Sequence, residues 1–519
     1  MRATFRVFLF PLFGTLAACG GGGGGGGSGP PVGGGTTWRS GVFQPSSTFD
    51  NMCVNPRAGT ADRTGTRTDQ NNWLRSWTNE LYLWYGEVTD RDPSLYATDQ
   101  YFDLLKTNAT TSPSGNPKDK FHFTYDTAAW EALSQGGTSS GYGADFTILA
   151  PIPPRRIVVA FTEAGSPGGM QLARGDEILE VDGADAVNGN TQAIVDTLNA
   201  GLFPDANGEN HSFLVRNTAG ATRTVSLTSQ TITEVPVPIA TTLPTPSGAV
   251  GYIQFNDHIA TAEDDLEAAI NTLKTANVTD LILDLRYNGG GYLDMASELA
   301  YMIGNTTLTS GRTFEKLVFN DKNPTRDPVT GEQLMPTPFH STSQGFSGAA
   351  GRPLPTLNLD RVYIIAGPGT CSASESIINS LRGVNVQVYI IGSTTCGKPY
   401  GFYPQDNCGT TYFSIEFRGE NAANFGDYSD GFSPANQTGT VGVAVPGCSV
   451  ADDFSHLLGD ADEARIAAAL AFRASNNQSC PAPSGISPPR LAKASFGLED
   501  GGGLAVSKPA ARSNRILRR

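Results

Sequence analysis

The most constraining feature of this chain is a serine between a predicted strand and a predicted helix, with a lysine after the following strand. Residues 361–367 form a β-branched, apolar run that ends in Gly-Pro-Gly, which predicts a buried strand. Residues 374–381 carry apolar side chains at helical spacing, and 386–392 predict the next strand. Ser372 precedes the helix and Lys398 follows the second strand. Alternating strands and helices of this kind indicate an α/β fold.

Ser372 is a candidate nucleophile because of where it lies. The N–H groups and the dipole at a helix N-terminus favour a developing negative charge, as an oxyanion requires. A serine hydroxyl needs a nearby base, and a lysine serves as that base only when burial lowers its pKa towards neutrality. The alternative interpretation is that Ser372 only caps the helix and that Lys398 is a surface charge.

A second strand–loop–helix unit lies upstream. Residues 280–285 predict a strand, 286–291 form a loop with three glycines, and 293–303 predict a helix. Glycines let backbone N–H groups approach a ligand closely. The loop can equally be a glycine-rich turn without a ligand.

Three motifs, LDLRYNGGG, SASES and GKPYGF, occur in this order and resemble those of the C-terminal processing (tail-specific) serine proteases. The resemblance covers roughly residues 70–475 and looks closest to a bacterial lipoprotein subfamily. It implies that Ser372 is the nucleophile and Lys398 the base. It also implies an oxyanion hole made by the N–H of Ser372 together with that of Gly289 or Gly290. The implied enzyme is a serine endopeptidase that acts on protein or peptide substrates without a cofactor.

The chain departs from the family at one position. Many members carry a Gln four residues after the lysine, where it helps to hold the lysine, but this chain has Phe402. A lipoprotein that binds peptides but is catalytically impaired therefore stays open as an alternative. Two other hydrolase interpretations are a Cys371 nucleophile and a serine hydrolase with His258 or His456 as base, although no GxSxG motif supports the latter.

A PDZ-like domain is expected over residues 136–232. Gly141, Tyr142 and Gly143 resemble a carboxylate-binding loop, and predicted strands at 157–161 and 177–181 and a helix at 191–199 follow. In such a domain a peptide adds as a strand beside the helix while loop N–H groups bind its terminal carboxylate. An ordinary small β-rich domain without a peptide ligand is the alternative.

The N-terminus predicts export. Two arginines precede an apolar segment that ends Leu-Ala-Ala-Cys, so residues 1–19 are expected to be a lipoprotein signal peptide with Cys19 as the lipidated residue. A glycine-rich tether is expected over 20–48. Gly20 rather than Asp after the cysteine favours the bacterial outer membrane, on its periplasmic side.

The remaining boundaries follow from composition and periodicity. A helical region is expected over 49–135, a mixed-sheet protease core over 233–480 and a disordered tail over 481–519. The formal net charge of −14 argues against nucleic-acid binding. Six cysteines besides Cys19 suggest disulfides in an exported protein, and their spacing does not resemble a metal site. If Ser372 and Lys398 meet, Cys371 and Cys396 must also lie near each other.

Overall fold

The computed structural model describes residues 38–112, 114–439, 441–485 and 515–517. The predicted signal peptide and Cys19 therefore lie outside the described residues, as does most of the predicted tether. Residues 38–48 are described and include a short 3-10 helix, η1 (Ser46–Thr48). Among the described helices, none is both long and apolar enough to cross a bilayer.

The centre of the molecule is a six-stranded sheet in the order β12-β13-β14-β18-β19-β26. The first pair is antiparallel and the other four pairs are parallel. This mixed sheet confirms the predicted α/β class. Its strands are β12 (Ile239–Leu243), β13 (Val250–Gln254), β14 (Asp280–Asp284), β18 (Arg361–Ala366), β19 (Gln387–Gly392) and β26 (Gly447–Ser449).

Helices cover both faces of this sheet. Side chains alternate along a strand, so Leu281 and Leu283 pack with one set of helices while Ile282 packs with another. The first set comprises α6 (Ala262–Thr275), α7 (Leu293–Ile303) and α9 (Ala373–Gly383). The opposite face packs against α10 (Ala464–Ala474). The predicted strand–helix–strand order around Ser372 is therefore present, with Ser372 at the start of α9.

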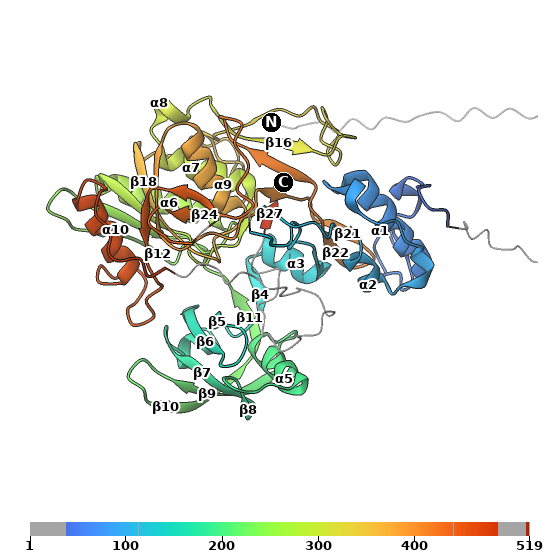
Figure 1. Cartoon of the computed structure of the whole chain (residues 1–519), viewed down its shortest axis with the longest axis horizontal. Helices are drawn as coiled ribbons and strands as arrows, with labels where there is room; N and C mark the ends of the chain where they lie inside the picture. The colour runs from blue at the N-terminus through green and yellow to red at the C-terminus, as the bar shows by residue number, and fades with distance from the viewer. Residues whose placement is uncertain (1–37, 113, 440, 486–514, 518–519) are drawn as a thin grey trace, which may run out of the picture. The chain divides into compact units, whose positions relative to one another are not determined.

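A separate β-rich unit is inserted before the central sheet (Figure 1). Its strands follow the order β10-β9-β7-β6-β5, with β8 paired to β7, around an apolar core of their own. The chain enters and leaves it through an antiparallel ribbon of β4 (Thr138–Gly141) and β11 (Gln230–Thr233). The other elements are β5 (Ala144–Ala150), β6 (Arg156–Thr162), α4 (Pro167–Gln171), β7 (Glu177–Val181), β8 (Ala184–Asp185), α5 (Gln192–Leu202), β9 (Asn210–Arg216) and β10 (Thr222–Thr228).

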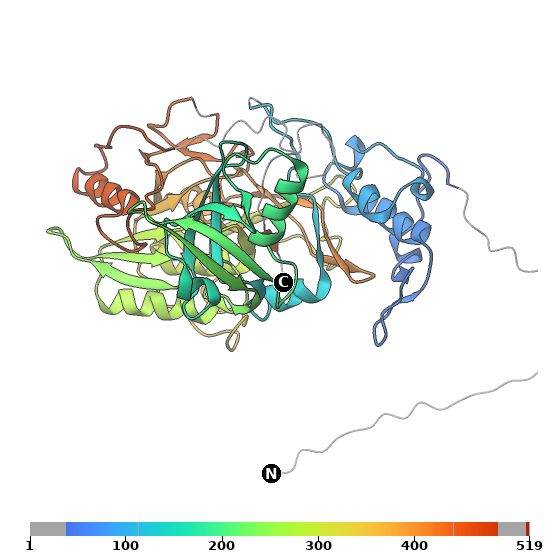
Figure 2. The ribbon, with the colours of Figure 1, turned by 90° about the horizontal axis from the view of Figure 1, so that it is seen from below.

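In both views, the N-terminal helices lie at one end of the unit that starts at Ser40 (Figures 1 and 2). Helix α1 (Arg67–Leu81) starts at a capping box in which Thr66 and Asp69 bond each other's backbone N–H. Its Trp73 and Trp77 stack on one another at 5.3 Å. The other elements are β1 (Met52–Cys53), β2 (Arg63–Thr64), η2 (Tyr85–Glu87), η3 (Pro93–Leu95), α2 (Thr98–Asp103), β3 (Phe123–Asp126) and α3 (Thr127–Ser134).

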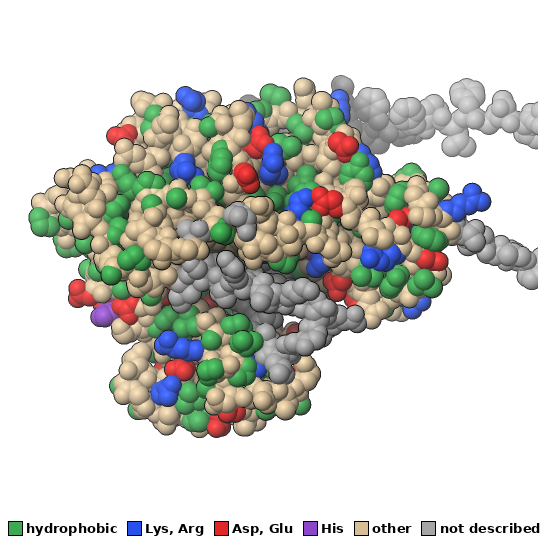
Figure 3. All heavy atoms as spheres, in the orientation of Figure 1, with side chains coloured by type: hydrophobic (Ala, Val, Ile, Leu, Met, Phe, Trp, Pro, Cys, Tyr) green, Lys and Arg blue, Asp and Glu red, His purple; other side chains and the backbone are tan. Residues whose placement is uncertain are grey.

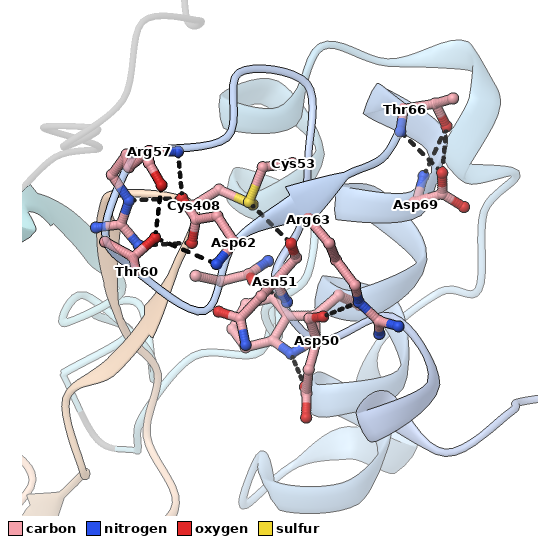
Figure 4. The surroundings of a disulfide bond; sticks show 12 residues. Asp50, Asn51, Cys53, Arg57, Thr60, Asp62, Arg63, Thr66, Asp69 and Cys408 are labelled. Atoms are coloured by element: carbon pink, nitrogen blue, oxygen red, sulfur yellow. Dashed lines mark hydrogen bonds and ion pairs between the residues drawn. A yellow bond between two sulfur atoms is a disulfide. The ribbon is translucent and has the colours of Figure 1, made fainter.

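This region is joined to the part of the chain after residue 400 by a disulfide and by a strand. Cys53 is bonded to Cys408 across most of the sequence, and Figure 4 shows the polar contacts around that bond. Strand β3 extends the sheet of β21 (Gln405–Asn407) and β22 (Thr410–Phe413). The remaining described elements are α8 (Thr306–Thr309), β16 (Thr313–Phe319), β17 (Thr337–Pro338), β20 (Tyr400–Gly401), β23 (Phe417–Glu420), β24 (Phe432–Pro434) and β25 (Val443–Val445).

Of the predicted disordered tail, the structure describes residues 481–485 and 515–517. Ser484 and Gly485 donate backbone hydrogen bonds to Ser449, beside the disulfide that joins Cys480 to Cys448. Residues Arg515–Leu517 form strand β27, which pairs with β15 (Gly290–Tyr292). The rest of the tail lies outside the described residues.

On the face drawn in Figure 3, acidic and basic side chains are interspersed.

Candidate active site

Ser372 lies at the turn between β18 and α9 in an unusual backbone conformation. It is the N-cap of α9, with φ of 63° and ψ of −120°. A residue other than glycine in this region costs on the order of 1–3 kcal/mol, so the surrounding structure must hold it there, as is common at functional sites. The Ser372 hydroxyl is buried and makes no hydrogen bond within the described part of the chain. Ser372 and Glu375 also form a capping-box arrangement at the start of α9, so the capping interpretation stands beside the catalytic one.

Lys398 lies on the loop after β19 and is fully buried. Two links hold this loop against the start of α9. The first is a disulfide between Cys371 and Cys396, whose Cα atoms are 5.2 Å apart. The second is the carboxylate of Glu375, because its Oε2 accepts from the N–H of Ser372 at 3.1 Å and from the N–H of Lys398 at 2.8 Å. The structure thus brings the two sequence-predicted residues into one site.

Glu375 is more than the helix-dipole partner that its position in the first turn of α9 suggests. Its other oxygen accepts from the N–H of Gly397 at 2.9 Å and from the Thr395 hydroxyl. Burial raises the pKa of the Glu375 carboxyl, and the hydrogen bonds from Thr395 and the backbone oppose that rise. The carboxyl group therefore fixes the lysine loop to the nucleophile helix.

Two aromatic rings contact the Lys398 ammonium. The Nζ atom lies 3.9 Å from the ring centroid of Phe402 and 5.1 Å from that of Phe121. An ammonium over an aromatic face is attracted by the ring quadrupole. Phe402, the departure from the family pattern, thus occupies a place beside the lysine. Phe121 comes from the N-terminal region, so that region contributes to the site.

Lys120 is a second lysine in the site, half-buried, and no local sequence pattern indicates it. Its Nζ donates to the carbonyl of Cys396 at 2.8 Å, two residues before Lys398. It also lies 5.4 Å from the centroid of the Phe121 ring that Lys398 contacts. Burial lowers the pKa of Lys120, against the attraction of Glu375 and Asp430. Lys120 therefore also holds the lysine loop, through the carbonyl of Cys396.

Asn288 shapes the glycine loop, as expected from the sequence. Its Oδ1 accepts from the N–H of Gly290 at 2.9 Å and lies 2.9 Å from His258 Nδ1. Its main-chain carbonyl accepts from the N–H of Cys371 at 3.1 Å, which joins this loop to the nucleophile turn. The N–H of Gly290 is therefore engaged, in contrast to the predicted oxyanion role. Gly289 has no recorded N–H bond among the described residues.

Within the described residues, the structure records no hydrogen bond between the hydroxyl of Ser372 and Lys398. The N–H of Ser372 is likewise engaged by Glu375 rather than turned to a ligand. The rival nucleophile Cys371 is in a disulfide. Of the rival bases, His456 is exposed and pairs with Asp453.

The predicted carboxylate-binding loop lies at the start of β5, the edge strand of the β-rich unit. Tyr142 is buried, and its hydroxyl donates to the carbonyl of Gly201 on α5. Gly143 has a φ of 67°, and a Cβ there would lie 2.4 Å from the side chain of Ser166. Gly141 ends β4, within the ribbon that leads into the unit. The edge strand and α5 give the unit the elements that a PDZ groove needs.

Arg174 connects this unit to the glycine loop. Its guanidinium donates to the Tyr287 hydroxyl at 2.7 Å and to Asp452 at 2.8 Å. Tyr287 in turn donates to Asp452 at 2.6 Å and directly precedes Asn288. The β-rich unit and the residue before the glycine loop therefore belong to one hydrogen-bonded cluster.

One group of side chains in the site has metal-ligating types at short range. The donor atoms of Cys371, Glu375 and Cys396 all lie within 4.8 Å of one another. Both sulfur atoms belong to the disulfide, so this group offers no thiolate to a metal.

Comparison with known proteins places this site in a family. Residues 249–401 match the model of peptidase family S41. A carboxyl-terminal-processing protease of Picosynechococcus sp. is 27% identical over 275 residues, which cover 51% of this chain and 56% of the relative. The chloroplastic carboxyl-terminal-processing peptidase 2 of Arabidopsis thaliana is 23% identical over 333 residues, which cover 62% of this chain and 57% of the relative.

A solved structure supports the fold. A Bacteroides fragilis protein assigned as an S41 protease matches 78% of this chain and 98% of its own length, with a TM-score of 0.56 and 21% identity. The chain spans little more than half the length of the two curated relatives described above. The matched segment includes both Ser372 and Lys398, and the resemblance carried by the three motifs is confirmed: the chain carries a peptidase family S41 domain.

Proposed function

We propose that this protein is a serine endopeptidase in which Ser372 is the nucleophile and Lys398 the general base. The observation that carries this proposal is the double link between the strained Ser372 turn and the Lys398 loop, through Glu375 and the Cys371–Cys396 disulfide. A serine and a lysine that only lay on the surface would not need to be held together by a buried carboxylate and a disulfide. The match of residues 249–401 to an S41 peptidase supports the same activity.

The mechanism follows from the positions of these groups. Neutral Lys398 accepts the proton of the Ser372 hydroxyl as the oxygen attacks the scissile carbonyl, and it returns the proton to the leaving amine. A water then hydrolyses the acyl-enzyme. The N–H of Gly289 and the N–H groups at the start of α9 stabilise the oxyanion. The N–H of Ser372 contributes to this stabilisation only after its hydrogen bond to Glu375 breaks.

The proposed substrates are exported proteins recognised at their C-termini. Strand β5 lies at the edge of the β-rich unit, which suits an added peptide strand, and Gly141, Tyr142 and Gly143 are the proposed carboxylate-binding loop, supported by the hydrogen bond from Tyr142 to α5. Three disulfides are typical of an oxidising compartment. We place the protein in the bacterial periplasm, anchored by lipid on Cys19 to the outer membrane.

Substitution of the nucleophile tests this proposal. Ser372→Ala is expected to abolish cleavage of an unfolded protein and to leave the melting temperature within a few degrees of the parent, because the hydroxyl makes no hydrogen bond. Cleavage is followed by gel and folding by thermal denaturation. Turnover in the variant would refute the assignment. A parent protein that binds peptides but neither cleaves them nor reacts with a fluorophosphonate would instead be the impaired binding protein.

A further inference from the structure

His258 lies beside the glycine loop of the candidate site, on the connection between β13 and α6. Its side chain is fully buried, and its ring packs on that of Phe255 with 4.4 Å between the centroids. The N–H of His258 donates to the carbonyl of Gly290 at 3.2 Å, and its carbonyl accepts from the N–H of Tyr292 at 2.9 Å. A Cβ at Gly291 would lie 2.3 Å from that carbonyl oxygen, so a glycine is needed for this approach. The backbone of His258 is therefore fixed against the loop.

The side chain of His258 has a defined proton position. The Asn288 amide is oriented by two backbone groups, because its Nδ2 donates to the carbonyl of Phe255 at 2.9 Å and its Oδ1 accepts from the N–H of Gly290 at 2.9 Å. Nδ1 of His258 lies 2.9 Å from the same Oδ1. An amide oxygen only accepts hydrogen bonds, so Nδ1 carries a proton and donates it to Asn288.

Asn288 also joins the glycine loop to the turn of the nucleophile. Its main-chain carbonyl accepts from the N–H of Cys371 at 3.1 Å and from the hydroxyl of Ser374 at 3.1 Å. These two residues lie on either side of Ser372 in the chain. A shift of Asn288 therefore moves the N–H groups of the loop relative to the Ser372 hydroxyl, and acyl transfer requires a fixed geometry between those groups.

We propose that His258 is a positioning residue of the oxyanion hole, which fixes the N–H groups of the glycine loop by donating its Nδ1 proton to Asn288. The inference rests on the proposed peptidase function and deepens it. His258 acts through Asn288 and not on the substrate, so its role differs from that of the general base considered for it from the sequence.

The sharing of Asn288 Oδ1 by two donors allows one of them to leave. A buried acceptor that loses its last donor carries a desolvation cost. When the N–H of Gly290 turns to a substrate oxyanion, where it joins that of Gly289, the Nδ1 proton of His258 remains on Oδ1. His258 thus lowers the cost of presenting a second loop donor, and this gain arises in the transition state rather than in the bound substrate.

A peptide aldehyde and the corresponding alcohol test this role in the full chain. The Ser372 oxygen adds to the carbon of acetyl-trialanine aldehyde as its proton passes to Lys398, and the former carbonyl oxygen occupies the oxyanion hole. The alcohol forms no such adduct. His258→Phe keeps an aromatic ring on Phe255 but removes the donor. It is expected to lower kcat on an unfolded protein and to weaken the aldehyde by a similar factor, on the order of 10- to 100-fold.

The ground state provides the internal control. KM and the inhibition constant of the alcohol are expected to stay within about twofold of the parent values, because ground-state binding does not use the oxyanion hole. The matched control variant is His211→Phe. His211 is half-buried and pairs with Asp182 at 2.6 Å in the β-rich unit, and its substitution should keep the parent kcat and aldehyde affinity.

Two further substitutions separate the donor at Nδ1 from mere polarity. His258→Asn places an amide N–H where Nδ1 stood, and it is expected to regain part of kcat and of the aldehyde affinity. His258→Gln places its amide at the position of Nε2 and is expected to stay as impaired as His258→Phe. Melting temperatures of all variants report on the fold.

Amide hydrogen exchange of the segment 286–292, followed by mass spectrometry, reads the loop without requiring activity. Exchange is expected to be faster in His258→Phe than in the parent or in His258→Asn. Equal exchange and equal aldehyde affinity in the parent and His258→Phe would overturn the inference. Faster exchange without a selective loss of aldehyde affinity would overturn it as well, because His258 would then have only a structural role.

Failure of the proposed function gives a different result. A parent protein that neither cleaves an unfolded protein nor is labelled by a fluorophosphonate would refute the peptidase, whatever the exchange shows. A parent that does both, with His258→Gln as active as His258→Asn, would refute only the positioning role of the Nδ1 donor.

Discussion

At the scale of residues, the site depends on how one lysine is held rather than on its presence alone. The backbone N–H of Lys398 donates to Glu375, and its ammonium contacts the rings of Phe402 and Phe121. Lys120 holds the same loop by the carbonyl of Cys396. An arrangement with this many fixed contacts suits a group that must meet a substrate oxygen in one geometry.

Lys398→Arg is expected to be nearly as inactive as Lys398→Ala. An arginine keeps the positive charge but does not lose its proton in a protein, so it cannot accept the proton of Ser372. Initial rates on an unfolded protein measure the effect, with thermal denaturation as the control for folding. Substantial activity in the arginine variant would show that the position supplies charge rather than a base.

Lys120→Met is expected to lower kcat by about tenfold and to change KM little, because its loss frees the carbonyl of Cys396 and loosens the loop of Lys398. The neighbouring Lys118, which is half-buried and pairs with Glu87, provides the control, and Lys118→Met should keep the parent kcat. If Lys120 had only a structural role, its loss would lower the melting temperature and would not lower kcat selectively over KM. Lys120→Arg should restore part of the activity, since it can still donate to the carbonyl.

At the scale of elements, α6 and α7 are joined by a buried pair of carboxyl groups. Glu263 of α6 accepts N–H groups from the loop at 345–348, and Glu298 of α7 accepts the N–H of Gln344 at 2.6 Å. Burial, together with the charge of Glu263, raises the pKa of Glu298 to about 9. Protonated Glu298 then donates to Glu263, so the two carboxyl groups that join the helices and the loop hold one proton between them.

This pair predicts a pH dependence of stability. The pKa of Glu298 is raised on folding from 4.5 to about 9, so the free energy that it contributes to folding is fully present below about pH 4.5. It is lost as the pH rises through about 9. Urea denaturation from pH 5 to 9 should show a smaller loss of stability for Glu298→Gln than for the parent, because the amide stays neutral. The exposed Glu131→Gln should follow the parent, and an unchanged slope in Glu298→Gln would contradict the shared proton.

Local pattern predicted these elements well where the contacts are local. The run at 361–366, the apolar spacing of α9 and the boundaries of α7 were all expected, and Ser372 was correctly placed at a helix start. The role of Glu375 was not, because its partners Gly397 and Lys398 belong to a different segment. Lys120 and Phe121 lie still further away in sequence, and β27 is too short for a periodic signal.

At the scale of the whole molecule, the β-rich unit and the catalytic segment are linked by the cluster of Arg174, Tyr287 and Asp452. Tyr287 precedes the glycine loop directly. The residues of LDLRYNGGG that precede its glycines are held as well. Arg286 forms buried ion pairs with Asp284 and Glu463 at the base of the loop.

A peptide with a free C-terminal carboxylate is expected to be cleaved in preference to its amidated form, with the difference mainly in KM. A peptide in which an internal Asp is replaced by Asn controls for the lost charge. A bulky residue at Gly143 would not serve as a test, since its Cβ would collide with Ser166. Equal KM values for the free and amidated peptides would leave the β-rich unit a structural role while the peptidase assignment stands.

The Cys371–Cys396 bond also ties the proposed site to the redox state of its surroundings. Cytosolic thiols are kept reduced, so under the proposed export a newly made chain carries Ser372 and Lys398 on two segments without a covalent link between them. In that proposal the link closes only where oxidants are present. Competence for cleavage would then be a late step in the life of the molecule, and the proteins of the compartment where it is synthesised would be spared.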